Sequence, residues 1–282
     1  MKIGITGATG QLGRIVVEEL KEKTSANDLV ALVRSPQKAN DLDIEVREFD
    51  YNNPNHEALA GIDKLLLISG NEIGKRIEQH TRVIDAAKKA GVRMLVYTSL
   101  LRTDSSSLVL AGEHHKTEEA IVSSGIPYVF LRDGWYTENY TASLPHVVAM
   151  GILYGSSGNG KISSASRKDY AEAAAIVLTS AGHEGQVYEL AGDESFTMSD
   201  LAAEISRQVG KAIDYVNLPE DEYAQLLVKA GLPAGAAQFY AGTHTATTLG
   251  DLFDDSRQLS KLIGRPTTSL EKVISEALEQ AK

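Results

Sequence analysis

The chain has 282 residues, 43% of them hydrophobic and none of them cysteine. This composition supports an ordinary globular core and excludes a disulfide-stapled miniprotein, a thiolate metal site and a cysteine nucleophile. Lys and Arg total 28 against 38 Asp and Glu, a net charge of −10, which is the wrong sign for binding a phosphate backbone. We therefore expect no nucleic-acid partner.

Short β-rich runs alternate with amphipathic segments over the first half of the chain. Six strands are predicted, at residues 2–6, 29–33, 44–49, 64–68, 93–98 and 128–131. The segments between them carry apolar residues at helical spacing, as Val16 and Leu20 do. Such an order predicts parallel strands joined by crossover helices, and a continuous apolar run such as 65–68 suits a strand covered on both faces. The predicted fold is α/β, a Rossmann-type doubly wound parallel sheet.

The regular alternation weakens after about Gly134. A glycine- and serine-rich segment, 151–160, is predicted to be a loop. The elements expected after it are a helix at 168–178, a strand at 187–190, a helix from Thr197, a strand at 214–217, helices at about 219–229 and 234–241, and a final helix. Thr197-x-x-Asp200 and Thr268-x-x-Glu271 predict the N-terminal caps of two of these helices. We predict a Rossmann domain over 1–140 and a smaller mixed C-terminal lobe over 141–282, partly interleaved with the sheet.

The apolar runs are short. The longest, 173–178, falls far below the ~20 residues that a membrane-spanning helix needs. The first seven residues reach a glycine turn without a basic segment followed by a long apolar stretch, so no signal peptide is predicted. We expect a cytoplasmic protein that does not bind membranes, and the sequence is compatible with either a monomer or a homodimer.

A glycine-rich turn follows the first predicted strand and begins the first predicted helix. Its spacing is G-x-x-G-x-x-G, which suits a pyrophosphate, because a side chain would block the backbone's approach and the helix N-terminus offers amide donors. A glycine turn that binds no ligand is the alternative, and the strand-turn-helix context argues against it. The predicted cofactor-binding residues of this turn are Gly7, Ala8, Thr9, Gly10, Gln11, Leu12 and Gly13.

The residue that closes the second predicted strand distinguishes the two nicotinamide cofactors. An acidic side chain there would bind the ribose 2′-hydroxyl of NADH, whereas a basic one accepts the 2′-phosphate of NADPH. Arg34 occupies this position, 21 residues after Gly13, and its planar guanidinium suits phosphate. NADPH is therefore the predicted cofactor, with NADH binding more weakly; a solvated strand-end cation is the alternative interpretation of Arg34.

The chain resembles the NmrA-like, atypical branch of the short-chain dehydrogenases, and most of all the bacterial quinone oxidoreductase 2 type. The resemblance lies in the Thr-Gly-Ala-Thr-Gly opening, in several blocks along nearly the whole chain, and above all in Leu131-Arg-Asp-Gly-Trp-Tyr-Thr-Glu-Asn-Tyr140. The triphenylmethane dye reductases share the turn and Arg34 but match this run less well. The resemblance implies that the cofactor is also bound by residues at strand ends and in this run: Asp50, Tyr51, Ser69, Gly70, Thr98, Trp135, Tyr136 and Asn139.

Classical short-chain dehydrogenases use a Tyr-x-x-x-Lys pair, in which the lysine lowers the tyrosine pKa so that the phenol can protonate an alkoxide. No tyrosine in this sequence has a lysine four residues later. This absence disfavours alcohol or ketone redox by that route. A quinone is electrophilic enough to accept hydride without a strong positioned acid, so the site is expected mainly to hold the nicotinamide against a flat acceptor.

The predicted catalytic residues are His114 and Tyr136. Trp135 and Tyr136 could stack on an aromatic acceptor, although a lone tryptophan is as readily explained by core packing. His114 matches a family position for histidine and has an ordinary pKa near neutrality, which suits a proton donor; a surface or structurally bonded histidine is the alternative. His114 and His115 are adjacent and lack the spacing of zinc ligands, so no metal is predicted.

One residue departs from the family's run. The family usually has asparagine where this chain has Asp133. A carboxylate near the cofactor phosphates would repel them, so either Asp133 turns away or cofactor affinity changes, and Arg132 beside it could neutralise the charge.

The predicted function is reduction of a small-molecule quinone to hydroquinone by NADPH. Two alternatives stay open at this stage. One is a non-catalytic NADP(H)-sensing regulatory protein, because some NmrA-like proteins bind a dinucleotide and regulate a partner. The other is a reductase of conjugated dyes, since flat electrophiles share the same geometric requirement.

Overall fold

The computed structural model describes residues 1–280 and divides the chain into two compact units. The first unit contains residues 1–104, 110–133 and 167–190, and the second contains 105–109, 134–166 and 191–282, of which the last two residues are not described. The division falls after Asp133, earlier than the expected boundary at 140. Residues 167–190 belong to the first unit, although they follow part of the second unit in the chain.

The first unit is built on a seven-stranded parallel sheet with the order β3-β2-β1-β4-β5-β6-β8. Its strands are β1 (Ile3–Thr6), β2 (Leu29–Val33), β3 (Glu45–Glu48), β4 (Lys64–Leu67), β5 (Met94–Leu100), β6 (Tyr128–Asp133) and β8 (Val187–Leu190). The six strands predicted in the first half and the later strand at 187–190 are all confirmed. Because the order reverses between β1 and β4, the carboxyl ends of these two strands form the crevice where doubly wound sheets bind ligands.

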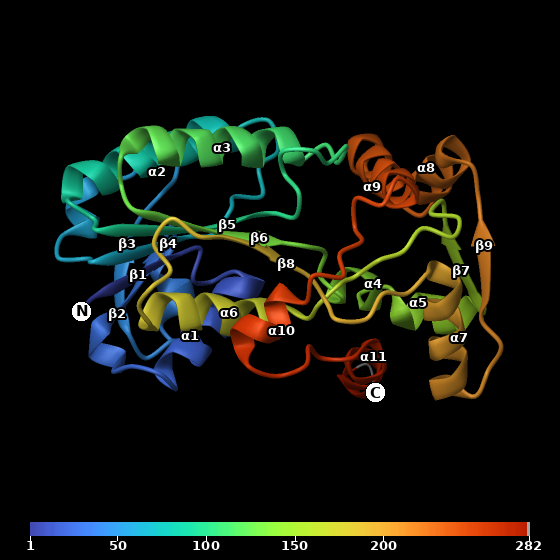
Figure 1. Ribbon diagram of the computed structural model, residues 1–282. Helices are drawn as coiled ribbons and strands as arrows, with labels where there is room; N and C mark the ends of the chain where they lie inside the picture. Colours follow the sequence, from blue (N-terminus) through green and yellow to red (C-terminus); the bar gives the residue numbers. More distant parts are fainter. Residues whose placement is uncertain (281–282) are drawn as a thin grey trace. The chain divides into compact units, whose positions relative to one another are not determined.

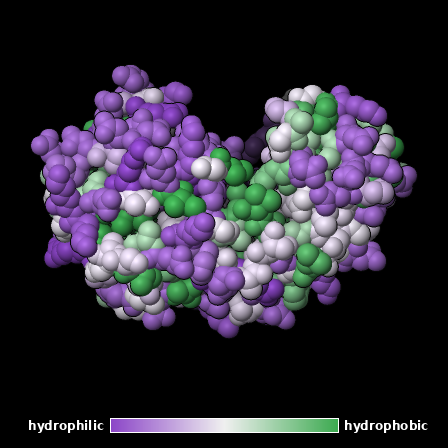
Figure 2. Space-filling view, turned by 90° about the horizontal axis from the view of Figure 1, so that it is seen from above, coloured by the Kyte–Doolittle hydropathy of each residue, from purple (hydrophilic) through white to green (hydrophobic). Residues whose placement is uncertain are grey.

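Helices cover both faces of this sheet (Figure 1). α1 (Gln11–Lys21) packs beside α6 (Arg167–Thr179) on one face, and α2 (Arg76–Ala90) packs beside α3 (Ala111–Ser124) on the other. Three short 3-10 helices, η1 (Ala26–Asp28), η2 (Pro36–Ala39) and η3 (His56–Leu59), lie in the connections. Figure 2 shows that the outer surface over α2 and α3 is mostly hydrophilic, as expected for amphipathic helices.

The core between the sheet and the α2–α3 layer explains why the strands are so apolar. Leu65, Leu95 and Val83 are fully buried in one cluster with other residues of both layers. Each such side chain contributes on the order of 1.5–3 kcal/mol by leaving water. The strands whose ends form the crevice are therefore fixed by a densely packed core.

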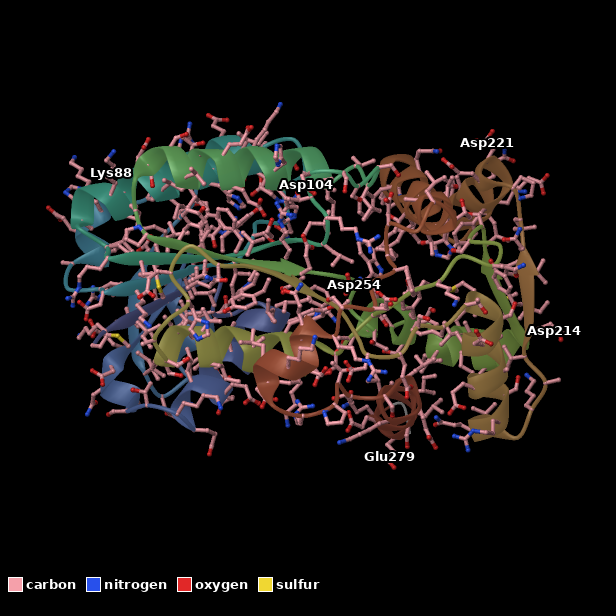
Figure 3. All side chains as sticks on the ribbon, viewed as in Figure 1. Lys88, Asp104, Asp214, Asp221, Asp254 and Glu279 are labelled. Atoms are coloured by element: carbon pink, nitrogen blue, oxygen red, sulfur yellow. The ribbon has the colours of Figure 1, made fainter. Side chains whose placement is uncertain are left out.

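The second unit is mixed, as the sequence predicted. It contains the two-stranded parallel sheet of β7 (Ile152–Gly155) and β9 (Asp214–Asn217). Its helices are α4 (Glu138–Thr141), α5 (Leu144–Met150), α7 (Met198–Val209), α8 (Glu220–Lys229), α9 (Ala234–Thr248), α10 (Gln258–Ile263) and α11 (Leu270–Gln280). Acidic side chains such as Asp214 and Asp221 point outward from this unit (Figure 3).

Three expectations for the second unit need correction. The predicted loop at 151–160 contains β7, because residues 152–155 find a partner strand 62 positions later in the chain. The predicted helix at 234–241 runs on to Thr248, where Thr243 and Thr247 are buried and donate their hydroxyls to carbonyl groups one turn back. The final helix begins at Leu270, one residue later than the Thr268 cap implies, and the Ser269 hydroxyl accepts the amide hydrogen of Lys272 at 3.3 Å. The helices α4, α5 and α10 were not predicted.

Candidate active site

The glycine turn joins β1 to α1 as the sequence predicted. Gly7 has a φ of +61°, a conformation that favours glycine, and its carbonyl accepts the amide hydrogen of Gly10 at 2.8 Å. Gly10 is the N-cap of α1 and is exposed, and no side chain caps the helix. The first amide groups of α1 are consequently available to an anion, together with the positive end of the helix dipole.

The last two glycines of the turn have different physical roles. A Cβ on Gly13 would overlap the carbonyl oxygen of Gly7 and lie 2.8 Å from the Cα of Ala8, so the fold itself requires glycine there. A Cβ on Gly10 would meet only the Gly7 oxygen, at 3.2 Å. The protein thus leaves open space over Gly10, which is what close approach of a pyrophosphate needs.

Arg34 stands directly after β2, as predicted, and is exposed. Its guanidinium forms no hydrogen bond or salt bridge within residues 1–280. It does interact with Glu72, whose pKa is lowered by hydrogen bonds from Gln79 and Lys75 and then by the charges of Lys75 and Arg34. The segment that follows it is fastened to α1, because Arg14 donates to the Lys38 carbonyl and to the Asp41 carboxylate, each at 2.7 Å. This arrangement holds an exposed cation near the start of the dinucleotide turn, where it suits a 2′-phosphate.

The residues predicted at the carboxyl ends of β3, β4 and β5 are in the first unit, but most of their polar groups already have partners. The Thr98 hydroxyl accepts the Ser69 amide hydrogen at 2.9 Å. The Tyr51 hydroxyl donates to the Ile68 carbonyl at 2.8 Å, and the Asp50 carboxylate accepts the amide hydrogen of Asn52 at 2.9 Å. These side chains shape the rim of the crevice. Their contact with a cofactor stays a prediction.

Sequence reasoning missed two polar side chains of α2 that reach this rim. The amide hydrogen of Gly70 is donated to Nε2 of His80 at 2.9 Å, and the Gly70 carbonyl accepts from Nε of Arg76 at 2.8 Å. Both side chains are buried, at 0% and 4% exposure. The available signal was their position: polar residues at the spacing that α2 uses to face the core.

His114 lies in the first turn of α3, as expected, but its surroundings differ from those of an ordinary proton donor. It is 4% exposed, and its Nδ1 is 2.8 Å from the hydroxyl of the fully buried Tyr97. Burial, and then the charge of Arg76, lowers the pKa of His114 well below its usual value. Desolvation disfavours the imidazolium ion, so the ordinary near-neutral pKa of histidine no longer supports the proton-donor hypothesis at this buried position. A catalytic role for His114 stays a prediction without that support.

The aromatic residues of the family run belong to the second unit. Backbone bonds join Trp135 and Thr137 to Ala165, at 3.1 and 3.0 Å, so the segment between them is extended. The side chains of Trp135 and Tyr136 are half-buried, and Asn139 is exposed. Trp135 is consequently not a core residue, which leaves its ring partly available for stacking. The structure describes these residues and the glycine turn in separate units, so their joint role in one site stays a prediction.

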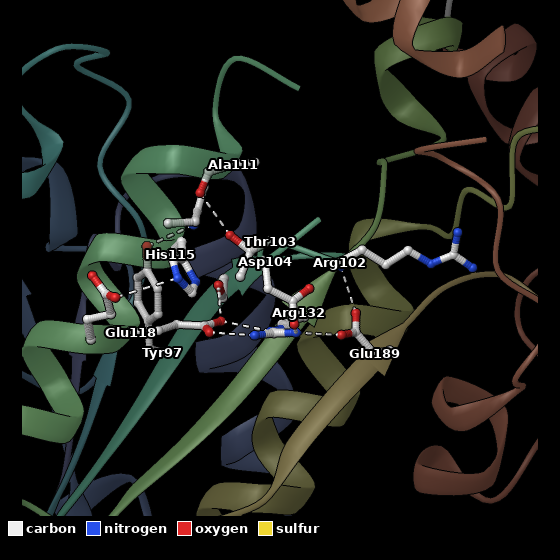
Figure 4. Close-up of polar contacts among 12 residues, drawn as sticks. Tyr97, Arg102, Thr103, Asp104, Ala111, His115, Glu118, Arg132 and Glu189 are labelled. Carbon is white, nitrogen blue, oxygen red and sulfur yellow. Dashed lines mark hydrogen bonds and ion pairs between the residues drawn. The ribbon is translucent and has the colours of Figure 1, made fainter. Parts of the chain in front are cut away.

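The expectation that Arg132 neutralises Asp133 is wrong. Arg132 donates to Glu118 at 2.7 Å and to Glu189 at 2.8 Å (Figure 4). Successive side chains of a strand point to opposite faces, so the guanidinium lies on the other side of β6 from Asp133. Asp133 is 4% exposed, its Oδ1 has no hydrogen-bond partner, and burial raises its pKa well above the usual range. The neutral carboxyl is favoured, and it would not repel a phosphate.

Two further features of residues 1–280 bear on what the protein binds. None of its helices combines the length and the apolar character needed to cross a membrane. Residues 1–280 contain no group of three or more His, Cys, Asp or Glu side chains arranged to hold a metal ion. The cytoplasmic location stays a prediction.

The fold and the turn define a Rossmann-type dinucleotide-binding protein, and comparison with known proteins specifies the class further. The NmrA-like family model matches residues 1–275. The chain therefore belongs to the NmrA-like family.

Several relatives are similar over nearly their whole length. Quinone oxidoreductase 2 of Escherichia coli is 51% identical over 278 residues, which is 97% of each chain. A crystal structure described as NADPH-dependent quinone oxidoreductase from Escherichia coli complexed with NADPH has a TM-score of 0.96 and covers 98% of this chain and 99% of its own. Triphenylmethane reductase of Citrobacter complexed with NADP(H) is 37% identical, with a TM-score of 0.95, covering 98% and 100%.

Proposed function

We propose that this protein is an NADPH-dependent quinone reductase. The observation that carries the proposal is the open glycine turn with an exposed arginine after the next strand, in a chain 51% identical to Escherichia coli quinone oxidoreductase 2. The turn would bind the pyrophosphate and Arg34 the 2′-phosphate. Bound NADPH supplies the hydride; one hydride and one proton reduce a quinone to a hydroquinone and leave NADP⁺.

The residues of the chain would bind the dinucleotide and orient the acceptor against it. The Gly7 to Gly13 turn and the rim after β3, β4 and β5 hold the dinucleotide, and Trp135 with Tyr136 would present an aromatic surface to the acceptor. No Tyr-x-x-x-Lys acid is present in the sequence, and burial, followed by the charge of Arg76, lowers the pKa of His114 well below its usual value. We infer that the proton reaches the reduced quinone from solvent.

The test is NADPH oxidation, followed by its absorbance, with and without a benzoquinone or a naphthoquinone and with an NADH control. The expected result is quinone-dependent loss of NADPH that is faster than the loss of NADH. Tight NADPH binding without turnover of any flat electrophile would instead identify a dinucleotide sensor.

A second candidate acceptor has support of its own. The likeness to triphenylmethane reductase extends over the whole of that chain, so a triphenylmethane dye belongs in the same assay. A kcat/KM for the dye that exceeds the value for quinones would assign the enzyme to dye reduction. The number of chains in the active protein is tested by its hydrodynamic mass, because the residues alone are compatible with a monomer or a homodimer.

A further inference from the structure

Helix α2 has an unusual inner face. Three of its polar residues, Arg76, Gln79 and His80, are buried, with exposures of 4%, 3% and 0%. Burying polar groups costs free energy unless each is hydrogen-bonded, and apolar residues at the same positions would avoid that cost. Their partners therefore indicate what the polar residues accomplish.

Two of these side chains bind both backbone polar groups of a single residue. Gly70 donates its amide hydrogen to His80 Nε2 at 2.9 Å and accepts at its carbonyl from Arg76 Nε at 2.8 Å. Gly70 follows β4, whose neighbour in the sheet is β1. This is the strand pair at which the sheet order reverses, so the Ser69–Gly70 turn forms the side of the crevice opposite the glycine turn of β1.

A chain of hydrogen bonds sets the tautomer of His80. Thr117 donates its only hydroxyl hydrogen to the Glu113 carbonyl at 2.8 Å. The same hydroxyl oxygen lies 3.2 Å from Nδ1 of His80, and with its hydrogen already committed it accepts from this nitrogen. Nδ1 consequently carries the imidazole proton, and Nε2 is left as the acceptor that the Gly70 amide requires.

Arg76, the second side chain that binds Gly70, is itself held in place by an ion pair. Arg76 pairs with Glu113 of α3 at 3.3 Å, and the Glu113 carboxylate also accepts the Gly74 amide hydrogen at 2.9 Å. The loop from Gly70 to Gly74 is thus fastened at both ends to α2 and α3. Burial, and then the charge of Arg76, lowers the pKa of His80 to about 3, so the ring stays a neutral acceptor throughout the ordinary working range of pH.

We propose that His80 and Arg76 are positioning residues for the dinucleotide. From α2, their side chains hold the backbone of the Ser69–Gly70 turn in the conformation that binds the cofactor. The proposal rests on the proposed function only in taking NADPH as the ligand. Neither side chain touches the cofactor in this scheme, and both act through the backbone of Gly70.

The test compares three variants with the wild-type protein. His80→Leu removes the acceptor and keeps an apolar side chain in the space, whereas His80→Gln keeps an acceptor oxygen at a similar reach. Val83→Ala is the matched control, because Val83 is fully buried in the same helix and its side chain packs into the apolar core cluster. The measurements are the NADPH Kd by titration, the midpoint of urea unfolding and, without cofactor, hydrogen exchange at the Gly70 amide.

We expect His80→Leu to raise the NADPH Kd at least tenfold and to speed exchange at Gly70. His80→Gln should raise the Kd less than threefold. Val83→Ala should lower the unfolding midpoint and leave the Kd within twofold. A folded His80→Leu variant with an unchanged Kd would overturn the proposal, as would a Val83→Ala variant whose Kd rises as much as that of His80→Leu.

A fourth variant, Thr117→Val, tests the proposal independently of whether His80→Leu folds. Thr117→Val removes the acceptor for Nδ1 and leaves His80 in place, so the ring is free to take the other tautomer. A Kd raised three- to tenfold supports the proposal, and an unchanged Kd contradicts it. These binding and exchange measurements need no quinone, so a wild-type protein that binds NADPH without reducing quinones would refute the proposed function and leave this inference standing.

Discussion

At the scale of single residues, the structure separates the glycines that the fold requires from the one that a ligand requires. We predict that Gly13→Ala destabilises the protein, because the added methyl group would overlap backbone atoms of Gly7 and Ala8. Gly10→Val should lower the urea midpoint less than Gly13→Ala does and abolish NADPH binding, since its side chain would occupy the space above the turn. Titration with NADPH and urea unfolding of both variants check this. Retained binding in Gly10→Val would show that the pyrophosphate lies elsewhere.

Arg34 is expected to decide the cofactor preference. Its guanidinium is exposed and forms no hydrogen bond within residues 1–280, although the charge of Glu72 interacts with it. A hydrogen bond from this cation to a phosphate would contribute roughly 1.5–3 kcal/mol. Because 1.4 kcal/mol is tenfold in affinity, Arg34→Asp should weaken NADPH binding by about 10- to 100-fold and shift the preference towards NADH. The kcat/KM ratio of the two cofactors is the measurement. A ratio equal to that of the wild-type protein would remove this role from Arg34.

Asp133 is expected to lower stability at neutral pH. Its pKa is raised in the folded state, so between its unfolded pKa and its folded pKa the unfolded chain is ionised while the folded chain holds the proton. Stability is therefore lost as the pH rises through this window. Asp133→Asn, which has no proton to lose, should remove this pH dependence, so its free energy of unfolding relative to the wild-type protein should be higher at pH 8 than at pH 5. A difference that is constant with pH would show that Asp133 does not titrate in this way.

At the scale of elements, the sequence pattern of a capping box correctly predicted the N-terminus of α7. The Thr197 hydroxyl accepts the amide hydrogen of Asp200, and the Asp200 carboxylate accepts that of Thr197, which forms the capping box predicted for α7. Thr197→Ala should lower the free energy of unfolding by about 1 kcal/mol, the usual cost of losing an N-cap. Ser199→Ala is the control, because Ser199 is an exposed residue of the same first turn. Equal effects of the two changes would contradict the cap.

Other elements could not be predicted because their support is distant in the sequence. β7 lies in a glycine- and serine-rich segment with no strand signal of its own, and it exists because β9 pairs with it. The second half of α9 contains four threonines, which are poor helix formers, yet the helix continues because Thr243 and Thr247 are buried with their hydroxyls bonded to the preceding turn. Tertiary contacts override weak local propensity in both cases.

At the scale of the whole molecule, buried histidines predict sensitivity to acid. Burial lowers the pKa of His80 to about 3 and that of His244 to about 4, and it lowers the pKa of His114 as well. The unfolded chain binds these protons near pH 6.5, whereas the folded protein does not, so stability is lost as the pH falls below about 6.5. Each such group contributes on the order of 1.4 kcal/mol per pH unit until its folded pKa is reached.

The measurement for this prediction is urea unfolding at pH 7.5, 6.0 and 5.0, with a separate probe for each unit, because His80 and His114 lie in the first unit and His244 in the second. His80→Gln should flatten the pH dependence of the first unit only. Unfolding free energies that are equal at the three pH values would show that these histidines titrate normally in the folded protein.

The sequence by itself determined the parallel sheet, the glycine turn and the position of Arg34, because each of these depends on a local pattern: apolar runs, glycine spacing and the end of one strand. Only the tertiary structure decided which polar groups are free. Arg132 faces two glutamates instead of Asp133, His114 is buried against Tyr97, and His80 binds Gly70 ten residues away. The burial and the partners of a side chain depend on elements that the fold brings together from distant parts of the chain, and these surroundings set its pKa and its hydrogen bonds.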